Sequence, residues 1–453
     1  MKNIIRKVAA FTIGCRLNQA DTALIFDRLE KEDFEIVDTS YEGEIGILII
    51  NSCTVTSSAA VKSRNAVRKF RKLHPECCIV LTGCSAEVDT EIWQKELGVS
   101  LVVPNSEKRN IVEYLDQYFA NKMQFGESLI ISRNEHIHET KCHENFLEEA
   151  STANYFKSRA FLKVQEGCNN FCSYCIVPYA RGRERSREYD ELEADFKQLL
   201  AQGYKEIILT GVNVSSYSDR KSGKNLVDLV EALTAIEGDF RVRLSSTEPH
   251  KNNRDLLPMM AKNSKVCNFL HLSLQHGADT ILKAMNRQYS TTEYAEFVAE
   301  ARRLMPNIHI GTDVIIGFPG ETEEDFEKSC QFIEEINFAN IHIFTYSPRK
   351  GTPAASYKGQ VSKDVAKERY KKLSAIAQKS ANKYVESQIG VILRVLFEER
   401  SSNNIASGWS DNYVRIEVQD NDQNEIILEQ QLYDVKVKEF ASENVMRAEL
   451  LKK

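Results

Sequence analysis

The stretch that decides the fold of this 453-residue chain is Gly167-Cys168-Asn169-Asn170-Phe171-Cys172-Ser173-Tyr174-Cys175. It carries three cysteines in a CxxxCxxC spacing, directly after the apolar, strand-like segment Phe161–Val164. Three thiolates on one short loop can hold one face of an iron–sulfur cubane, because thiolates are soft, anionic donors. Three protein ligands leave one of the four irons with an open position, where a small molecule can coordinate.

A zinc knuckle or a chance grouping is the alternative explanation of this motif. Random placement of the 11 cysteines would produce the spacing on the order of 0.01 times. Zinc usually takes four ligands in CxxC pairs, and no second pair follows here. The motif therefore favours an iron–sulfur cluster on Cys168, Cys172 and Cys175.

The motif stands near the start of a series of alternating strands and helices. The expected strands are Phe161–Val164, Glu206–Leu209, Arg241–Leu244, Phe269–Leu272, His309–Ile316 and Ile341–Phe344, with helices such as Glu191–Ala201 and Glu323–Ile336 between them. Six strand–helix units predict a partial (β/α)6 barrel rather than a closed eightfold one. We assign residues 154–386 to this α/β core.

The first 120 residues alternate in the same way and predict a separate parallel α/β sheet domain. Expected strands are Val8–Ile13, Ile45–Ile50, Ile79–Leu81 and Leu101–Val103; expected helices are Gln19–Lys31, Ser57–Leu73 and Glu87–Leu97. Residues 121–153 are polar and without clear periodicity, which indicates a linker.

Three further cysteines, Cys15, Cys53 and Cys84, each follow the carboxyl end of an expected strand of the first domain. These ends share one edge of a parallel sheet, so the three sulfurs are expected to meet there. Gly14 and Gly83 would allow close backbone approach. Ordinary buried cysteines are the alternative, but the downstream triad favours a second three-ligand cluster. The other five cysteines follow no ligand spacing and are interpreted as structural.

Short alternating strands separated by polar turns follow from about residue 387 to 453 and predict a small antiparallel β-barrel. This region has 8 Lys and Arg against 12 Asp and Glu. Any RNA contact there would therefore need a local patch or aromatic stacking, for which Trp409 and Tyr413 are the candidates.

The overall composition is that of an ordinary globular protein, with 42% hydrophobic and 27% charged residues. The net charge of −6 excludes a general polycation, so nucleic-acid binding must use local basic patches. No apolar run reaches the ~18 residues of a membrane span, and the amino terminus lacks the features of a signal peptide. We expect a cytoplasmic protein without membrane association, in which clustered cysteines are metal ligands rather than disulfides.

The CxxxCxxC motif with Tyr174 before its last cysteine resembles that of the radical S-adenosylmethionine (SAM) superfamily. More narrowly, the motifs around Cys15, Cys53 and Cys84, the run Cys175-Ile176-Val177-Pro178-Tyr179-Ala180-Arg181-Gly182 and the run Tyr346-Ser347-Pro348-Arg349-Lys350-Gly351-Thr352-Pro353-Ala354 resemble the methylthiotransferase family. The carboxy-terminal barrel resembles the TRAM domain of that family. The motifs occur in the family's order along nearly the whole chain.

This resemblance implies two [4Fe–4S] clusters and two molecules of SAM. One SAM donates a methyl group to sulfur on the auxiliary cluster of Cys15, Cys53 and Cys84. The other is cleaved at the cluster of Cys168, Cys172 and Cys175, and its radical activates a carbon that receives the methylthio group. It also implies a tRNA anticodon stem-loop as substrate, an electron donor such as flavodoxin or ferredoxin, and a sulfur source.

The run Cys53-Thr54-Val55-Thr56 with Lys62-Ser63-Arg64 resembles most the branch that modifies carbon 2 of N6-threonylcarbamoyladenosine. The branch acting on N6-isopentenyladenosine and the one acting on a ribosomal-protein aspartate are alternatives. An RNA-binding scaffold with structural or redox-sensing clusters is the alternative outside enzymes.

By the same resemblance the expected cofactor contacts are Tyr174 in the cysteine loop, Asp313 and Val314 in the fifth strand, and the strand-end residues Thr210, Gly211, Asn213, Glu248 and Gln275. A packing or turn role is the alternative for each. Two basic runs are candidates for RNA phosphates. The first is Arg181, Arg183, Arg185 and Arg187; the second, on the helix after Cys53, could equally be a solvated face paired with acids.

Overall fold

The computed structural model describes residues 6–96, 98–125, 158–249, 255–419, 427–442 and 444–451. The chain forms two compact units, the first of which comprises Met1–Phe156, Phe161–Asn169 and Cys175–Arg187. The second unit comprises Lys157–Ala160, Asn170–Tyr174 and Glu188–Lys453. The segments Phe161–Asn169 and Cys175–Arg187, which were expected in the α/β core, therefore belong to the same unit as the amino-terminal part of the chain.

A five-stranded parallel sheet in the order β2-β1-β3-β4-β5 forms the centre of the first unit. The strands are β1 (Lys7–Thr12), β2 (Glu35–Ile36), β3 (Ile47–Ser52), β4 (Cys78–Gly83) and β5 (Leu101–Val102). The prediction of a parallel α/β sheet is confirmed. The two-residue strand β2 was not expected.

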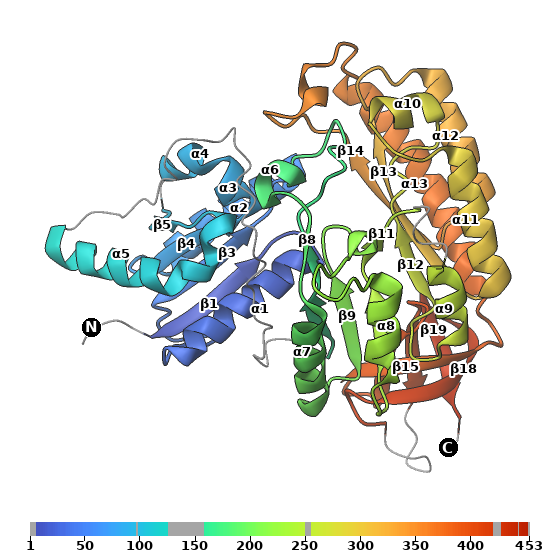
Figure 1. The fold of residues 1–453 in the computed structure, drawn as a ribbon, viewed down its shortest axis with the longest axis horizontal. Helices are drawn as coiled ribbons and strands as arrows, with labels where there is room; N and C mark the ends of the chain where they lie inside the picture. The colour runs from blue at the N-terminus through green and yellow to red at the C-terminus, as the bar shows by residue number, and fades with distance from the viewer. Residues whose placement is uncertain are drawn as a thin grey trace. The chain divides into compact units, whose positions relative to one another are not determined.

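Both faces of this sheet are buried, which explains why its strands are continuous apolar runs. One face packs on helices α1 (Arg16–Lys31) and α5 (Ile111–Phe125), the other on α2 (Ser57–Leu73) and the short α3 (Cys84–Val88) and α4 (Thr90–Gln94). Figure 1 draws these helices around the blue strands. The predicted helix Glu87–Leu97 is wrong as one element, because the non-helical backbone of Asp89 separates α3 from α4.

The predicted linker also differs from the structure at its start, because α5 continues to Phe125. The rest of the predicted linker, residues 126–153, lies outside the described residues. The remaining elements of this part of the chain are short: the 3-10 helix η1 (Asn105–Asn110), β6 (Ala160–Lys163), β7 (Gln165–Glu166), α6 (Val177–Arg181) and β8 (Arg185–Ser186). Strands β7 and β8 pair antiparallel.

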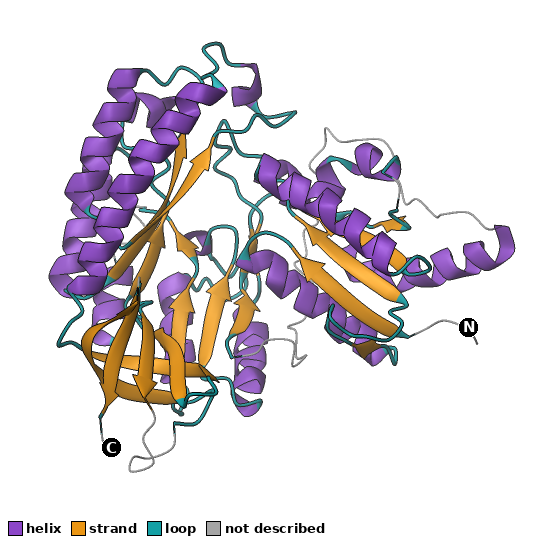
Figure 2. Ribbon diagram, turned by 180° about the vertical axis from the view of Figure 1, so that it is seen from behind, coloured by secondary structure: helices purple, strands orange, loops and turns teal. Residues whose placement is uncertain are grey.

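The second unit contains the rest of the α/β series. Strands β9 (Glu206–Thr210) and β10 (Arg241–Leu244) pair in parallel, and β11 (Ser246–Thr247), β12 (Phe269–Leu272), β13 (His309–Ile316) and β14 (Asn340–Thr345) form a parallel sheet in chain order. This order is that of an open barrel. Figure 2 shows the long helices of this unit lying along one side of the strands.

The helices of the second unit are α7 (Tyr189–Ala201), α8 (Leu226–Ala235), α9 (Leu256–Lys262), α10 (Asp279–Ala284), α11 (Thr291–Leu304), α12 (Glu323–Ile336) and α13 (Lys363–Glu386), with 3-10 turns η2 (Val214–Ser216) and η4 (Pro353–Ser356). Capping boxes fix the starts of α8, α11 and α12. Among the described residues, no helix combines the length and apolar character that crossing a membrane requires.

The carboxy-terminal strands close into a barrel in the order β15-β16-β17-β19-β18. They are β15 (Ile392–Arg400), β16 (Ile405–Ser410), β17 (Arg415–Gln419), β18 (Leu432–Ser442) and β19 (Val445–Leu450). The predicted small barrel is present, but it is not wholly antiparallel, because β17 and β19 pair in parallel. Strands β16 and β19 were not expected.

A buried ion cluster attaches this barrel to the α/β part of the second unit. Glu206 is fully buried and accepts hydrogen bonds from Arg241 at 2.6 Å and Arg243 at 2.7 Å. The same arginines donate to barrel carbonyls, those of residues 394 and 409 to 411. Although burial alone would raise the pKa of Glu206, the two guanidinium groups hold it well below its usual range.

Candidate active site

Cys15, Cys53 and Cys84 lie at the carboxyl ends of three neighbouring strands, β1, β3 and β4. Gly14 has φ 112°, and a Cβ at this position would lie 3.1 Å from Sγ of Cys53. Gly83 has φ 91°, and a Cβ there would lie 2.4 Å from the carbonyl oxygen of Ser52. Both glycines are therefore needed for the close approach of these turns to the neighbouring chain.

The three thiols are close enough to influence one another electrostatically. Burial, followed by the neighbouring Cys84, raises the pKa of Cys53 to about 12. Burial also raises the pKa of Cys84, and Cys15 adds to this effect, while Arg181 opposes it. Cys15 is exposed, whereas the other two are buried. The structure thus places three cysteines that the sequence separates by more than 30 positions at neighbouring turns of one sheet edge.

Arg181, at the end of α6, connects this triad to the rest of the first unit. Its Nε donates to Sγ of Cys84 at 3.2 Å, and its Nη2 donates to Oδ1 of Asn18 at 2.6 Å. Asn18 Oδ1 also accepts from Cys15 Sγ at 3.8 Å. A polar path therefore runs from Cys15 through Asn18 and Arg181 to Cys84.

A buried cluster of charges surrounds Arg181. Asp21 and Glu166, both 1% exposed, contact four cations, which are Lys108, Lys163, Arg181 and Arg185. Burial alone would raise the pKa of both carboxyls, but these cations hold each well below its usual range. Of these cations, Arg181 brings its guanidinium to Sγ of Cys84. A cationic donor at that position fits an anionic group, such as a thiolate-bound cluster.

The arginines proposed for RNA contacts do not form one exposed surface. Arg181 and Arg187 are 4% and 2% exposed, so the prediction of a phosphate contact is wrong for these two. Arg181 instead forms ion pairs with the buried carboxylates of Asp21 and Glu166, and Arg185 donates to Glu166 at 3.0 Å. Arg183 is exposed. In the second basic run, on helix α2, Arg64 and Arg68 pair with Glu96. This agrees with the alternative interpretation, in which the run is a solvated helix face paired with acidic residues.

The CxxxCxxC loop lies between β7 and α6. Its start is held in the first unit, where the amide of Cys168 donates to the carbonyl of Gly182 at 3.2 Å. Gly167 has φ 72°, and a Cβ there would lie 2.0 Å from the carbonyl oxygen of Arg183. After Cys175 the chain enters α6, which packs on α3, the helix that Cys84 begins.

In the second unit, Cys172 has its own arginine. Nη1 of Arg287 donates to Sγ of Cys172 at 3.2 Å, and Nη2 donates to Glu248 at 3.0 Å. Burial would lower the pKa of Arg287, but Tyr289, Tyr174, Glu248 and Cys172 together raise it well above its usual value. Arg287 could not be identified from the sequence, because an isolated arginine in a loop carries no local pattern.

Of the expected cofactor contacts in the second unit, Thr210, Gly211, Asn213, Glu248 and Gln275 lie at or just after strand ends, Asp313 and Val314 lie within β13, and Tyr174 lies in the CxxxCxxC loop. Several of them already have protein partners. Glu248 also accepts from Asn170 at 2.8 Å, and the Asn213 side chain caps η2. Gln275 has φ 70°, and its backbone forms an isolated parallel β-bridge with Val314. Among the described residues, the buried hydroxyl of Thr210 has no hydrogen-bond partner, which fits a ligand contact. Gly211 directly follows β9.

The aromatic candidates of the barrel are also engaged. Trp409 and Tyr413 stack on each other with centroids 4.7 Å apart, and Tyr413 contacts the ring of Phe269 in the α/β core. Arg243 lies over the Tyr413 ring. Tyr413 therefore packs against the α/β core rather than offering a free surface for base stacking.

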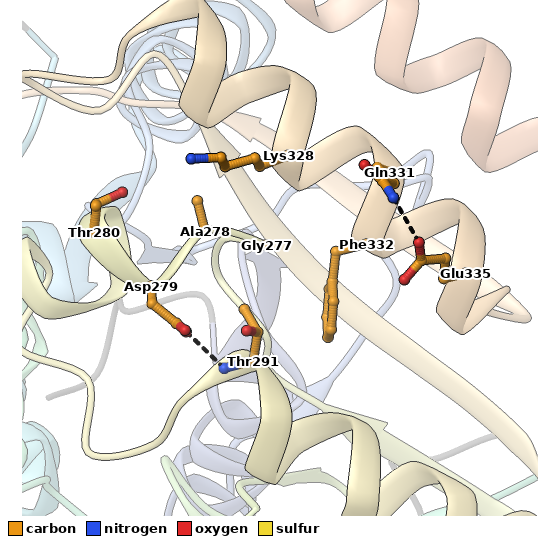
Figure 3. A pocket seen from close by; sticks show the side chains of 9 residues that line it. All are labelled: Gly277, Ala278, Asp279, Thr280, Thr291, Lys328, Gln331, Phe332 and Glu335. Carbon is orange, nitrogen blue, oxygen red and sulfur yellow. Dashed lines mark hydrogen bonds between the residues drawn. The ribbon is translucent and has the colours of Figure 1, made fainter.

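A pocket of about 330 Å³ lies elsewhere, between the loop before α10, the start of α11 and α12 (Figure 3). Its lining is mixed, with Phe332, Lys328 and Glu335 from α12. Asp279 accepts from the amide of Thr291 across it. None of the predicted site residues lines this pocket, so it is separate from the candidate active site.

Comparison with known families agrees with this geometry. Residues 162–333 match the Radical SAM superfamily and residues 7–104 match the uncharacterized protein family UPF0004. The chain resembles the radical SAM methyltransferase TsrM from Kitasatospora setae with a TM-score of 0.55, at 14% identity over 89% of this chain and 81% of that one. This likeness concerns the fold alone.

Curated relatives are more similar in sequence. Threonylcarbamoyladenosine tRNA methylthiotransferases from Bacillus subtilis and Aquifex aeolicus are 34% and 38% identical, over 90% and 87% of this chain and 89% and 93% of theirs. A tRNA-2-methylthio-N(6)-dimethylallyladenosine synthase from Clostridium botulinum is 34% identical over 88% of both chains. The two family models span both cysteine triads, since Cys15, Cys53 and Cys84 fall within residues 7–104 and Cys168, Cys172 and Cys175 within residues 162–333. The chain belongs to the tRNA methylthiotransferase family of radical SAM enzymes.

Proposed function

We propose that this enzyme adds a methylthio group to carbon 2 of N6-threonylcarbamoyladenosine, next to the anticodon of tRNA. Three relatives that carry this activity in their names are 31–38% identical over 87–98% of this chain. Relatives named for dimethylallyladenosine are 34% identical over 88% of the chain. The isopentenyl-type adenosine is therefore the second candidate substrate.

The observation that carries the chemistry is the packing of α6 on α3 within the first unit. It joins the segment that follows Cys175 to the helix that Cys84 begins. We infer that Cys15, Cys53 and Cys84 hold an auxiliary [4Fe–4S] cluster and that Cys168, Cys172 and Cys175 hold the cluster for SAM. Holding the reacting groups close together is worth several powers of ten in rate.

When bound, the clusters and SAM would supply reductive cleavage of the sulfonium bond and the sulfur for transfer. The residues of the chain then have supporting roles. Arg181 and Arg287 each donate a hydrogen bond to one ligand sulfur, which stabilises the anionic form of that sulfur. The buried hydroxyl of Thr210, which has no hydrogen-bond partner among the described residues, is proposed to contact a polar group of the cofactor. Further proposed contacts are Tyr174, Gly211, Asn213, Glu248, Gln275, Asp313 and Val314.

The carboxy-terminal barrel is proposed to be a TRAM-type module that contacts the tRNA anticodon stem-loop. Its closed five-stranded form supports this assignment. Arg183, exposed beside the CxxxCxxC loop, is the proposed phosphate contact on the α/β part. An electron donor of the flavodoxin or ferredoxin type, a sulfur source and a cytoplasmic location belong to the same proposal.

Mass spectrometry of tRNA nucleosides from strains with and without the gene tests the function. Loss of 2-methylthio-N6-threonylcarbamoyladenosine on deletion, restored by the wild-type gene and not by C172A, is the expected result. Loss of the isopentenyl derivative instead would move the assignment to the second candidate. Unchanged levels of both nucleosides would exclude tRNA as the substrate.

A further inference from the structure

Three metal-ligating side chains meet on neighbouring strands of the second unit, outside both cysteine triads. They are His271 on β12, Asp313 on β13 and His342 on β14. In the sheet register Asp313 pairs with His342, and His271 pairs with Gly311, two residues before Asp313. Side chains two apart on a strand point to the same face. The register therefore places all three on one face of the sheet.

The three side chains also converge. His271 Nε2 lies 3.0 Å from Asp313 Oδ2, and His342 Nδ1 lies 3.2 Å from Asp313 Oδ1. One ligand atom from each residue can be chosen so that all three lie within 4.8 Å of one another. Ligand atoms about 2.0–2.2 Å from one ion are about 3–3.5 Å apart. The two shorter distances already fall in this range.

The surroundings suit an ion that keeps open coordination positions. The exposed fractions of the side chains are 12% for His271, 23% for Asp313 and 55% for His342. The site is thus buried on one side and reachable from the other. Asn340 contacts Nε2 of His342 at 3.0 Å and orients the ring from behind, as an outer-shell partner of a ligating histidine does.

We propose that His271, Asp313 and His342 bind one divalent first-row transition-metal ion, with zinc as the probe. Two imidazoles and one carboxylate form a donor set that suits zinc and iron(II). None of its ligands belongs to a cysteine triad, and the ion would use the Asp313 carboxylate in place of the cofactor contact proposed for that residue. The proposal does not depend on the identity of the RNA substrate. In the absence of an ion, the same atoms form a hydrogen-bonded His–Asp–His chain.

The test uses anaerobically reconstituted holoenzyme, in which the cysteines are occupied by clusters. The protein is equilibrated with Zn²⁺ alone and desalted, and zinc and iron per chain are measured by mass spectrometry. Wild-type protein is expected to keep one zinc per chain. H342A removes a ligand. Loss of an outer-shell partner already lowers metal affinity by about tenfold or more, so H342A should bind zinc at least about tenfold more weakly than wild type. N340A should weaken binding to an intermediate degree.

His74→Ala provides the matched control, since His74 ends helix α2 in the first unit and is outside the proposed site. It should leave the bound zinc unchanged. Equal iron content in all variants shows that the clusters are intact. If wild type retains no more zinc than H342A, the proposal is overturned. The three residues then have only the role of a hydrogen-bonded chain. Retention that follows iron loss overturns it as well, since vacated cysteines would then hold the zinc.

Discussion

The guanidinium of Arg181 donates a hydrogen bond from Nε to Sγ of Cys84, 3.2 Å away, although the two residues are 97 positions apart in the chain. Arg287 makes the corresponding contact to Cys172 at the same distance. Each proposed cluster thus has one buried arginine that donates to a ligand sulfur. Because a hydrogen bond and a positive charge stabilise the more negative state of a cluster, both arginines are expected to raise reduction potentials.

Arg181→Gln should lower the reduction potential of the auxiliary cluster. A hydrogen bond to a charged group contributes about 1.5–3 kcal/mol, and about 60 mV corresponds to 1.4 kcal/mol for a one-electron couple. Only the difference between the two oxidation states counts, so we expect a shift of tens of millivolts. Potentiometric titration followed by electron paramagnetic resonance measures it.

Arg185→Gln is the control for this variant, because Arg185 donates to the same Glu166 and its other described hydrogen bonds go to the backbone carbonyls of Arg181 and Arg183. Its potential should remain close to that of wild type. Equal shifts in both variants would mean that the ion cluster as a whole acts, and not the hydrogen bond to sulfur.

Cys53→Ala should remove one cluster and leave the other. The iron content of the reconstituted protein is expected to fall by about half, with the spectrum of the SAM-type cluster unchanged, since each cubane depends on three thiolates. Cys172→Ala should give the reverse. Cys77→Ala is the control, because Cys77 is also buried in the first unit but belongs to neither triad. Full iron retention by C53A would contradict the two-cluster proposal.

Gly83→Ala should destabilise the first unit and reduce its iron content. At φ 91° a Cβ would lie 2.4 Å from the backbone oxygen of Ser52, so the turn that presents Cys84 must shift. Backbone strain at such a position costs about 1–3 kcal/mol. Gly203 has a similar φ of 93°, but a Cβ there would have no atom within 4 Å. Gly203→Ala therefore measures the backbone strain without the steric clash. Thermal unfolding and iron analysis should separate the two variants.

Glu206→Gln should destabilise the second unit by about 3–5 kcal/mol, because it leaves Arg241 and Arg243 buried without their counter-charge. In wild type the pKa of Glu206 is held below its unfolded value, so its contribution is present above about pH 5 and is lost as the pH falls. The difference between variant and wild type should therefore narrow in acid. Denaturant unfolding at several pH values measures this.

Glu449→Gln serves as the comparison, since the Glu449–Lys438 pair is exposed and solvent screening leaves such pairs little net effect on stability. A difference between E206Q and wild type that stays constant from pH 7 to pH 4 would contradict the assigned role of Glu206.

The inner strands of the first sheet were predictable because they are continuous apolar runs in a sheet buried on both faces. Strand β4 (Cys78–Gly83), for example, is buried at every position. The meeting of Cys15, Cys53 and Cys84 followed from their common place at strand ends. Strand β16 was missed, since Ile405–Ser410 contains Ser and Gly and its alternation appears only in the burial pattern.

The charge clusters could not be predicted, because they join residues far apart in sequence. Lys163 and Asp21, 142 positions apart, form one ion pair. The arginine run after the CxxxCxxC loop looked like an RNA surface for the same reason: a local sequence does not reveal which of its charges face buried carboxylates. Arg287 was missed because its partners, Cys172 and Glu248, come from two other segments.

The first unit draws Lys163, Glu166 and Arg181 from sequence beyond residue 156. A gene fragment that ended at residue 156 would encode Asp21 and Lys108 but not the other members of their ion network. Such a fragment would expose the Cys84 turn. It would also leave the Asp21 carboxylate, buried in the complete unit, without its partners Lys163 and Arg181. The amino-terminal part is therefore not an exchangeable module: any recombinant or natural chimera has to carry the segment up to Arg187 along with it.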